Sequence, residues 1–316
     1  MKHHDLYRTC AVGVIITAIC TVLLNAIIMA AYCIMPASLK KKVPNVMCVN
    51  QACANVSSIV PSLLISTVVF LLLDRRFYNP EVHQMYWVFF LYTNFLVVLS
   101  LFLSTLDRFL HLKFPSHYVR TASVKKAVVI VVVIWLISTV PPSLFRAALK
   151  EGDVYSVFTG VFTVLLVLTS LVLILLAVTF INLRGVIHHQ MEMKMSLSAD
   201  ETKEEERKRQ VANERQLVCV LFLRTCTYMC TLLPHIILRL VVLHRDMLGL
   251  PYSVRYWLSF TYLVYSFNGV LDPLLTIFLR QDFHRARRWV TLGLCSGNIT
   301  PVRQNVDETI IVTDEV

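Results

Sequence analysis

Charged side chains are scarce in this sequence of 316 residues: Asp, Glu, Lys and Arg make up only 16% of it, whereas apolar residues make up 56%. A soluble globular domain usually carries about 25% charged and about 45–50% apolar residues. The shortage of charge excludes an ordinary soluble domain and indicates a protein embedded in lipid. Because few residues lie outside the apolar stretches, the sequence predicts a single domain.

Apolar stretches alternate with charge clusters along the chain, and each stretch is close to the roughly 20 residues that a helix needs to cross a bilayer. The fifth stretch has no charged side chain from Tyr155 to Asn182. No internal repeat is visible, which disfavours transporters built from duplicated halves. We therefore predict an all-α membrane protein with a bundle of seven transmembrane helices at 9–35, 46–73, 82–110, 125–147, 154–183, 215–243 and 253–279.

Basic residues are sparse on one side of these stretches and frequent on the other. Lys40, Lys41 and Lys42 follow the first stretch, and most other Lys and Arg residues fall in segments on the same side. Basic loops remain cytoplasmic, so the amino terminus is expected outside the cell. The net charge of +10 then reflects membrane orientation. With no soluble basic domain to bind it, no nucleic-acid partner is expected.

Cysteine is absent from the expected outer loops, although the whole chain has nine cysteines. A disulfide framework is therefore disfavoured. The histidines are scattered, whereas a metal hydrolase would cluster His and Asp at one membrane face. The sequence thus predicts no metal site, no cofactor and no catalytic residue. A seven-helix membrane enzyme or ion pathway stays as an alternative of another class.

Polar and helix-breaking residues stand at particular depths of these spans, where each is costly in lipid and marks a functional position. In chain order they are Asn25, Asn50-Gln51-Ala52-Cys53-Ala54-Asn55, Asp107-Arg108-Phe109, Trp135, Pro234 and Asn268-x-x-x-Asp272-Pro273. Their order and spacing over nearly the whole chain resemble the motifs of rhodopsin-like G protein-coupled receptors.

The chain departs from that family pattern at several positions. Asn55 stands where the family has Asp and Asp272 where it has Asn, so the carboxylate is exchanged between two helices. Thr276 replaces a Tyr, the Trp before Pro234 is lost, and the outer cysteine of the third helix is missing. Melanocortin, cannabinoid and lysophospholipid receptors also lack that outer disulfide, and no subfamily is assigned. Val97 replaces a hydroxyl residue, so sodium binding is expected to be weak or absent.

The resemblance implies a multi-pass plasma-membrane receptor that passes an external signal to a cytoplasmic heterotrimeric G protein. It implies that Arg108 pairs with Glu214 at rest and that the sixth helix pivots at Pro234. Arg224 is expected to pair with Asp272; facing the G protein cleft, or snorkelling to the inner surface, are the alternatives. The expected switch residues are Asp107, Arg108, Glu214 and Arg224, and the expected core polar network is Asn25, Asn55, Asn268, Asp272 and Pro273.

The outer halves of the helices supply residues for a small extracellular ligand. Phe90 replaces the acidic residue of amine receptors, and no lysine follows Lys208 to form the Schiff base of an opsin. His235 and Arg239 share a helix face and favour an acidic ligand; lipid and odorant-type ligands stay open, and a plain core histidine is the alternative for His235. The full set is Phe90, Asn94, His235, Arg239, Tyr262 and Tyr265.

We expect an extracellular segment at 1–8, the seven-helix domain at 9–279, an amphipathic eighth helix at 280–295 and a cytoplasmic tail at 296–316. Apolar residues at helical spacing predict that the eighth helix lies on membrane lipid, with Cys295 as a palmitoylation site. The terminal Thr313-Asp314-Glu315-Val316 fits a PDZ-domain ligand. Because motif residues are lost, a receptor-like protein that binds ligand without signalling is a further alternative.

Overall fold

The computed structural model describes residues 2–35, 37–64, 80–151, 154–196, 201–242 and 252–280. The regular elements in these ranges are α-helices, which confirms the predicted all-α class. They are α1 (Lys2–Ile34), α2 (Ala37–Lys40), α3 (Val43–Ser57), α5 (Pro80–Lys113), α6 (Pro115–Thr121), α7 (Val124–Ile137), α8 (Val140–Glu151), α9 (Val154–Ser196), α10 (Glu201–Val242), α11 (Tyr252–Ser266) and α12 (Asn268–Leu279). Residues 59–64 are also helical.

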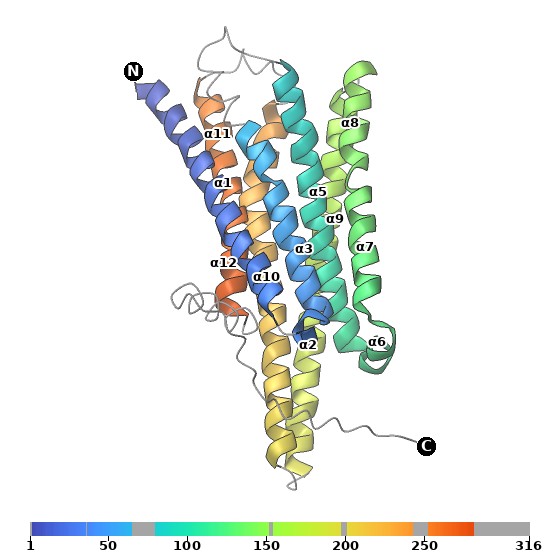
Figure 1. Cartoon of the computed structure of the whole chain (residues 1–316). Helices are drawn as coiled ribbons and strands as arrows, with labels where there is room; N and C mark the ends of the chain where they lie inside the picture. Colours follow the sequence, from blue (N-terminus) through green and yellow to red (C-terminus); the bar gives the residue numbers. More distant parts are fainter. Residues whose placement is uncertain are drawn as a thin grey trace.

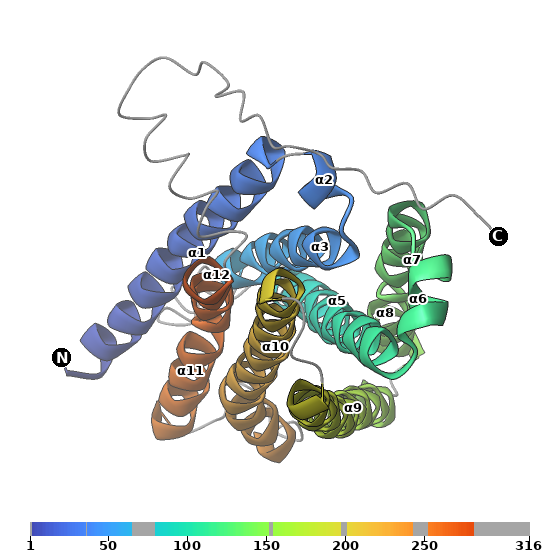
Figure 2. The ribbon, with the colours of Figure 1, turned by 90° about the horizontal axis from the view of Figure 1, so that it is seen from below.

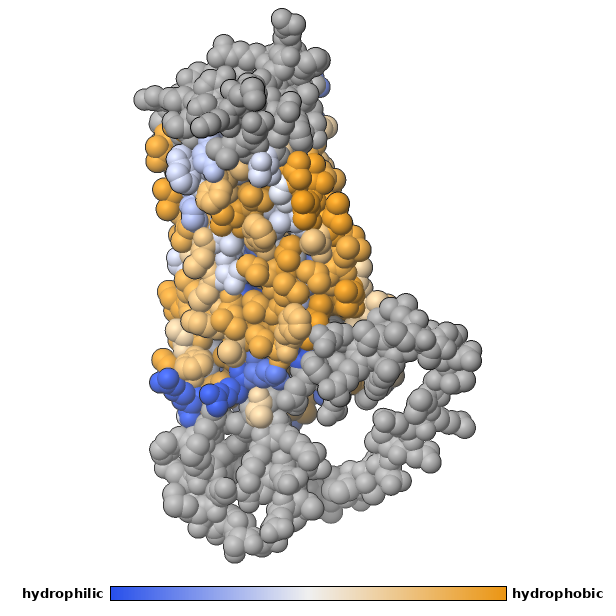
Figure 3. All heavy atoms as spheres, turned by 90° about the vertical axis from the view of Figure 1, so that its left-hand side faces the viewer, coloured by the Kyte–Doolittle hydropathy of each residue, from blue (hydrophilic) through white to orange (hydrophobic). Residues whose placement is uncertain are grey.

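Within the described ranges, six helical stretches are long and apolar enough to cross a membrane: Thr9–Ile34, Gln84–Lys113, Val124–Leu149, Ser156–Gly185, Glu214–Leu238 and Tyr256–Leu279. They match six of the expected spans. The remaining expected span, 46–73, contains α3 and is described only as far as residue 64. On the face drawn in Figure 3, hydrophobic side chains form a broad band, and hydrophilic ones gather at its lower edge.

The helices run up and down in one bundle. Seen from below, α5 lies among α3, α7, α8, α9 and α10, whereas α11 and α12 close the bundle between α1 and α10 (Figure 2). The apolar stretch of α5 is 72% buried and that of α7 and α8 only 22% buried. α5 is therefore the central helix, and α7 with α8 presents most of its apolar surface to the surroundings.

Two of the six described membrane-crossing stretches are each divided into two helices. α7 ends at Ile137, just ahead of Pro141 and Pro142, and α11 ends one residue before Phe267. In α12, Pro273 cannot donate to the carbonyl of Gly269, and that oxygen instead accepts a hydrogen bond of 3.3 Å from Asn25 Nδ2 of α1. The proline thus frees a backbone acceptor that connects α12 with α1.

Gly269 is also a point of close approach between α1 and α12. A Cβ atom built on Gly269 would lie 2.6 Å from Thr21 Oγ1 and 2.9 Å from Thr21 Cγ2. The Thr21 hydroxyl is held in place because it donates to Thr17 O over 2.8 Å. A side chain larger than hydrogen at this position would push the two helices apart.

Several expectations fall at or beyond the limits of the described residues. α1 begins at Lys2, so the segment 1–8 expected to precede the first span is mostly helical. The eighth helix expected at 280–295, Cys295 and the terminal Thr313-Asp314-Glu315-Val316 lie outside the described residues, apart from Arg280.

Candidate functional site

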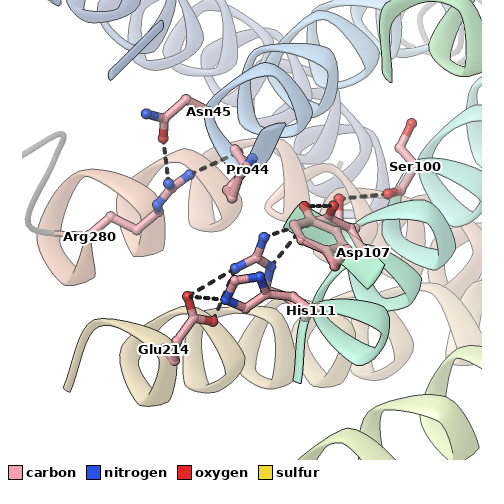
Figure 4. Close-up of polar contacts among 10 residues, drawn as sticks. Pro44, Asn45, Ser100, Asp107, His111, Glu214 and Arg280 are labelled. Atoms are coloured by element: carbon pink, nitrogen blue, oxygen red, sulfur yellow. Dashed lines mark hydrogen bonds and ion pairs between the residues drawn. The ribbon is translucent and has the colours of Figure 1, made fainter. Parts of the chain in front are cut away.

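An ion cluster joins the lower end of α5 to the lower half of α10. Arg108 Nη2 lies 2.5 Å from Asp107 Oδ2, and Arg108 Nη1 lies 3.0 Å from Glu214 Oε2. The Arg108 side chain is only 4% exposed and that of Glu214 17%. A buried guanidinium needs such partners, since an unpaired charge there would be strongly unfavourable. Figure 4 shows Asp107 and Glu214 on opposite sides of this cluster.

Tyr118 of α6 completes the cluster. Its hydroxyl donates to Asp107 Oδ1 over 2.5 Å, so both oxygens of Asp107 have partners. Burial together with the negative charge of Asp107 raises the pKa of Tyr118, which keeps the phenol protonated and able to donate. The short helix α6 therefore holds Asp107 in place beside Arg108. The sequence analysis did not single out Tyr118, because a lone tyrosine in a loop carries no recognisable spacing.

A second ion pair lies deeper in the bundle, between α10 and α12. Arg224 Nε lies 2.5 Å from Asp272 Oδ1, and both side chains are 6% exposed. The contact is ionic and is not aligned as a hydrogen bond. Arg224 also donates to the hydroxyl of Thr276 and lies 3.9 Å from Cys48 Sγ of α3. The sequence analysis considered three positions for the Arg224 side chain, and in the structure this side chain contacts Asp272.

The residues expected to form a core polar network lie around this pair. Asn55 Nδ2 donates to Asp272 Oδ2 over 2.6 Å and lies 3.5 Å from Asn25 Oδ1. Asn268 and Pro273 are buried in the same helix as Asp272. Arg224 and Asn55 thus each contact one of the two carboxylate oxygens of Asp272, and weak or absent sodium binding stays a prediction.

A third set of contacts links the middle of α3, α5 and α7. Asn50 Nδ2 donates to Ser100 Oγ over 2.9 Å, and Trp135 Nε1 donates to Asn50 Oδ1 over 2.9 Å. Asn50 thereby uses both its donor and its acceptor. These contacts give Asn50 and Trp135, two of the motif residues, a structural role in positioning the central helix.

Five of the six expected ligand residues meet in the upper half of the bundle. The Phe90 ring lies 5.4 Å from the ring of His235, and Tyr262 lies 5.3 Å from His235. Tyr265 donates to Asn94 Oδ1 over 3.1 Å, as Tyr228 does over 2.7 Å. The side chain of Arg239, the sixth, lies outside the described residues.

His235 is fully buried in this cluster. Its Nε2 lies 3.4 Å from the Tyr86 hydroxyl and its Nδ1 lies 3.3 Å from Thr261 Oγ1. Both ring nitrogens thus have polar neighbours, as a core histidine requires. The geometry agrees with the alternative of a plain core histidine and leaves a ligand contact to be tested.

A cavity of about 650 Å³ opens beside the lower ion cluster. Arg108 and Glu214 line this cavity, together with residues that the sequence analysis did not single out. Arg280 Nη2 donates to Asn45 Oδ1 over 2.6 Å, which ties the end of α12 to the start of α3. His111 Nε2 lies 3.5 Å from Glu214 Oε1. The spacing of His111, one helical turn after Arg108, was a signal that could have found it.

The described helices form an up-and-down membrane bundle with an ion cluster in its lower part. A family model described as the 7 transmembrane receptor (rhodopsin family) matches residues 24–275. The chain therefore belongs to the rhodopsin family of seven-transmembrane receptors, which confirms the resemblance read from the motifs. The family and the fold are those of signalling receptors rather than enzymes.

Among solved structures, the chain is similar to the crystal structure of squid rhodopsin, with a TM-score of 0.72 and 13% sequence identity. The match covers 92% of this chain and 87% of the squid protein. At this identity the likeness concerns the fold alone. No curated protein sequence matches the chain.

Proposed function

We propose that this receptor binds a small extracellular ligand and activates a cytoplasmic heterotrimeric G protein when α10 moves outward. The observation that supports this function is that α10 carries one member of each ion pair. Glu214 contacts Arg108 of α5, and Arg224 contacts Asp272 of α12. A ligand-biased switch needs an element with two discrete positions that differ in contact energy, and α10 has charged contacts to lose on two sides.

Pro234 is the proposed pivot of this movement. It lies inside α10, between Arg224 below and His235 above. Because proline cannot donate to the preceding turn, the helix is weakened at this residue. Displacement of His235 by a ligand would tilt α10 about Pro234 and pull its lower end away from Arg108. The lower cavity would then widen to admit the G protein.

The ligand chemistry follows from the upper cluster. Phe90, Tyr262 and Tyr265 surround His235 with aromatic surface, and no carboxylate for an amine stands among the described residues of this cluster. A small acidic, lipid or odorant-type molecule fits this surface better than a biogenic amine.

The start of α1 and the adjoining ends of α9 and α10 lie at opposite ends of the bundle (Figure 1). We therefore propose a plasma-membrane orientation with the amino terminus outside.

A ligand and G protein screen tests this function. The purified full chain in lipid nanodiscs would be mixed with purified heterotrimers of each subtype, and guanine-nucleotide exchange would be measured with carboxylates, lysophospholipids, odorants and amines. We expect one of the first three classes to accelerate exchange and amines to have no effect. Saturable ligand binding without exchange on any heterotrimer would reject the proposal in favour of a receptor that binds without signalling, for which the lost tyrosine at Thr276 is the supporting observation.

A further inference from the structure

An apolar groove of about 460 Å³ opens between α3 and α7. Seen from below, these two helices are neighbours (Figure 2). No residue that lines the groove carries a charge, and valines from both helices form much of its walls: Val46 and Val49 of α3, and Val128, Val131 and Val132 of α7. The groove lies along the helix pair that presents most of its apolar surface to the surroundings, so it opens toward lipid.

The side-chain polar groups of the groove already have partners within the protein. Trp135 Nε1 donates to Asn50 Oδ1 over 2.9 Å, and Asn50 Nδ2 donates to Ser100 Oγ over 2.9 Å. The hydroxyl of Tyr32, which lines the groove from α1, donates to Lys40 O over 3.3 Å. An occupant therefore meets apolar surface along the walls, and a hydrocarbon chain suits this surface.

A lysine stands at the lower end of each wall. Lys42 immediately precedes α3, one turn below Val46, and Lys125 lies in the first turn of α7, one turn below Val128. Residues three or four apart share a helix face, so each lysine lies in line with a wall of the groove. Both lysines are exposed. The lower rim of the groove is thus positively charged, whereas its walls are neutral.

The α7 wall is about as long as one leaflet is thick. Trp135 follows Lys125 by ten residues, which is about 15 Å at the helical rise of 1.5 Å per residue. The hydrocarbon core of a bilayer is about 30 Å thick, so one leaflet contributes about 15 Å. A lipid chain that enters beside the lysines can lie in the groove through the depth of its own leaflet.

We propose that this groove binds an anionic phospholipid of the leaflet on the side of the lower ion cluster. One acyl chain lies between α3 and α7, and the phosphate lies beside Lys42 and Lys125. A sterol would bring only a neutral hydroxyl to these cations. A second copy in a symmetric contact would bring the same lysines of both copies together. The site is separate from the proposed ligand and G protein sites, and its test needs neither.

Photo-crosslinking tests the site on the full chain. The protein would be placed in phosphatidylcholine nanodiscs with a trace of phosphatidylserine that carries a diazirine on one acyl chain, and the labelled residues would be identified by mass spectrometry. We expect labels on the α3 and α7 residues that line the groove. A small fraction of unlabelled phosphatidylserine should suppress this labelling, because it competes for one site, whereas an equal fraction of cholesterol should not.

The charges at the rim can be removed without changing the walls. Lys42→Gln and Lys125→Gln should each raise the fraction of phosphatidylserine needed for half-suppression about fivefold, the effect of one lysine near a membrane surface. Arg184→Gln combined with Arg215→Gln, at exposed positions of α9 and α10, removes the same amount of charge elsewhere and should leave this fraction unchanged. An equal effect of both sets of substitutions overturns the proposal, because the attraction would then come from net charge alone.

The groove can also be filled without changing any charge. Val132→Trp places a large side chain in it and should abolish the labelling, whereas Val133→Trp, at an exposed position outside the lining, should keep it. Both sites are on the surface, so both variants should keep the unfolding temperature of the wild type. Labelling that persists in Val132→Trp, or that cholesterol suppresses as well as phosphatidylserine does, overturns the proposal. A dimer that Val132→Trp dissociates also overturns it, because a second copy would then occupy the groove.

Discussion

Arg224 of α10 and Asp272 of α12 form an ion pair in the interior of the bundle, 2.5 Å apart and each 6% exposed. Asn55 of α3 holds the second oxygen of Asp272. α10 therefore cannot leave α12 unless two charges separate in a medium of low dielectric constant. Losing one member of such a pair typically costs about 3–5 kcal/mol. The exchange of carboxylate and amide between α3 and α12 places the carboxylate on the helix that Arg224 contacts.

Replacing either member of this pair should damage the receptor, and replacing both should repair it. Arg224→Leu and Asp272→Asn each leave one charge buried without its partner, so we expect surface expression to fall severalfold in each variant. The double variant removes both charges and should recover most of the expression. Flow cytometry with a tag outside the cell would measure this, with Arg184→Leu, an exposed arginine of α9, as the control. A double variant as poor as the sum of the two losses would show that the residues act independently.

Asn94 connects α5 with α10 and with α11 through two tyrosines. Tyr228→Phe and Tyr265→Phe each remove one hydrogen bond to Asn94 Oδ1 and should lower the free energy of unfolding by about 1 kcal/mol. Thermal unfolding in nanodiscs would detect this as a lower midpoint temperature. Tyr256→Phe, in α11 and without a described hydrogen bond of its hydroxyl, should leave the midpoint unchanged. Equal midpoints for all the variants would contradict the role of Asn94.

Gly269 should tolerate no side chain beside Thr21. In Gly269→Ala the new methyl group would lie 2.6 Å from Thr21 Oγ1, so we expect reduced stability and surface expression. Thr21→Ala removes the two clashing atoms and leaves Cβ at 3.4 Å, which is an ordinary contact, so the double variant should regain expression. Gly160→Ala is the matched control, because nothing lies within 4 Å of its added Cβ. If the double variant did not regain surface expression, a clash with Thr21 would not explain the loss in Gly269→Ala.

Much of the fold could be predicted from the sequence because a membrane leaves few choices. Backbone groups in lipid must be satisfied within the segment, so long apolar stretches become helices. The Arg224–Asp272 contact could also be predicted, because isolated charges in apolar spans need partners. The contact of Asn25 with Gly269 could not, because it depends on how α1 packs against the carbonyl that Pro273 leaves free.

The lower site was predicted only in part. Arg108 and Glu214 stood out because each occupies a motif position at the end of a span. Tyr118 and Asn45 lie near the membrane surface, where single polar residues are common and carry no pattern. The role of Tyr118 depends on the packing of α6 against the ion cluster, and that of Asn45 on its contact with Arg280 at the end of α12; spacing along the chain encodes neither. The functions of all these residues stay predictions.

The contact between Arg108 and Glu214 tests the central claim most directly. Glu214→Gln removes the carboxylate that holds α10 to α5, and Arg215→Gln, which changes the exposed neighbouring residue, is the control. Ligand-independent nucleotide exchange on a purified heterotrimer would be measured for both variants and the wild type. Because the pair is only partly exposed, we expect Glu214→Gln to raise basal exchange about fivefold and Arg215→Gln to leave it near the wild-type rate. Unchanged exchange in well-folded Glu214→Gln, with a measurable wild-type rate, would contradict the account.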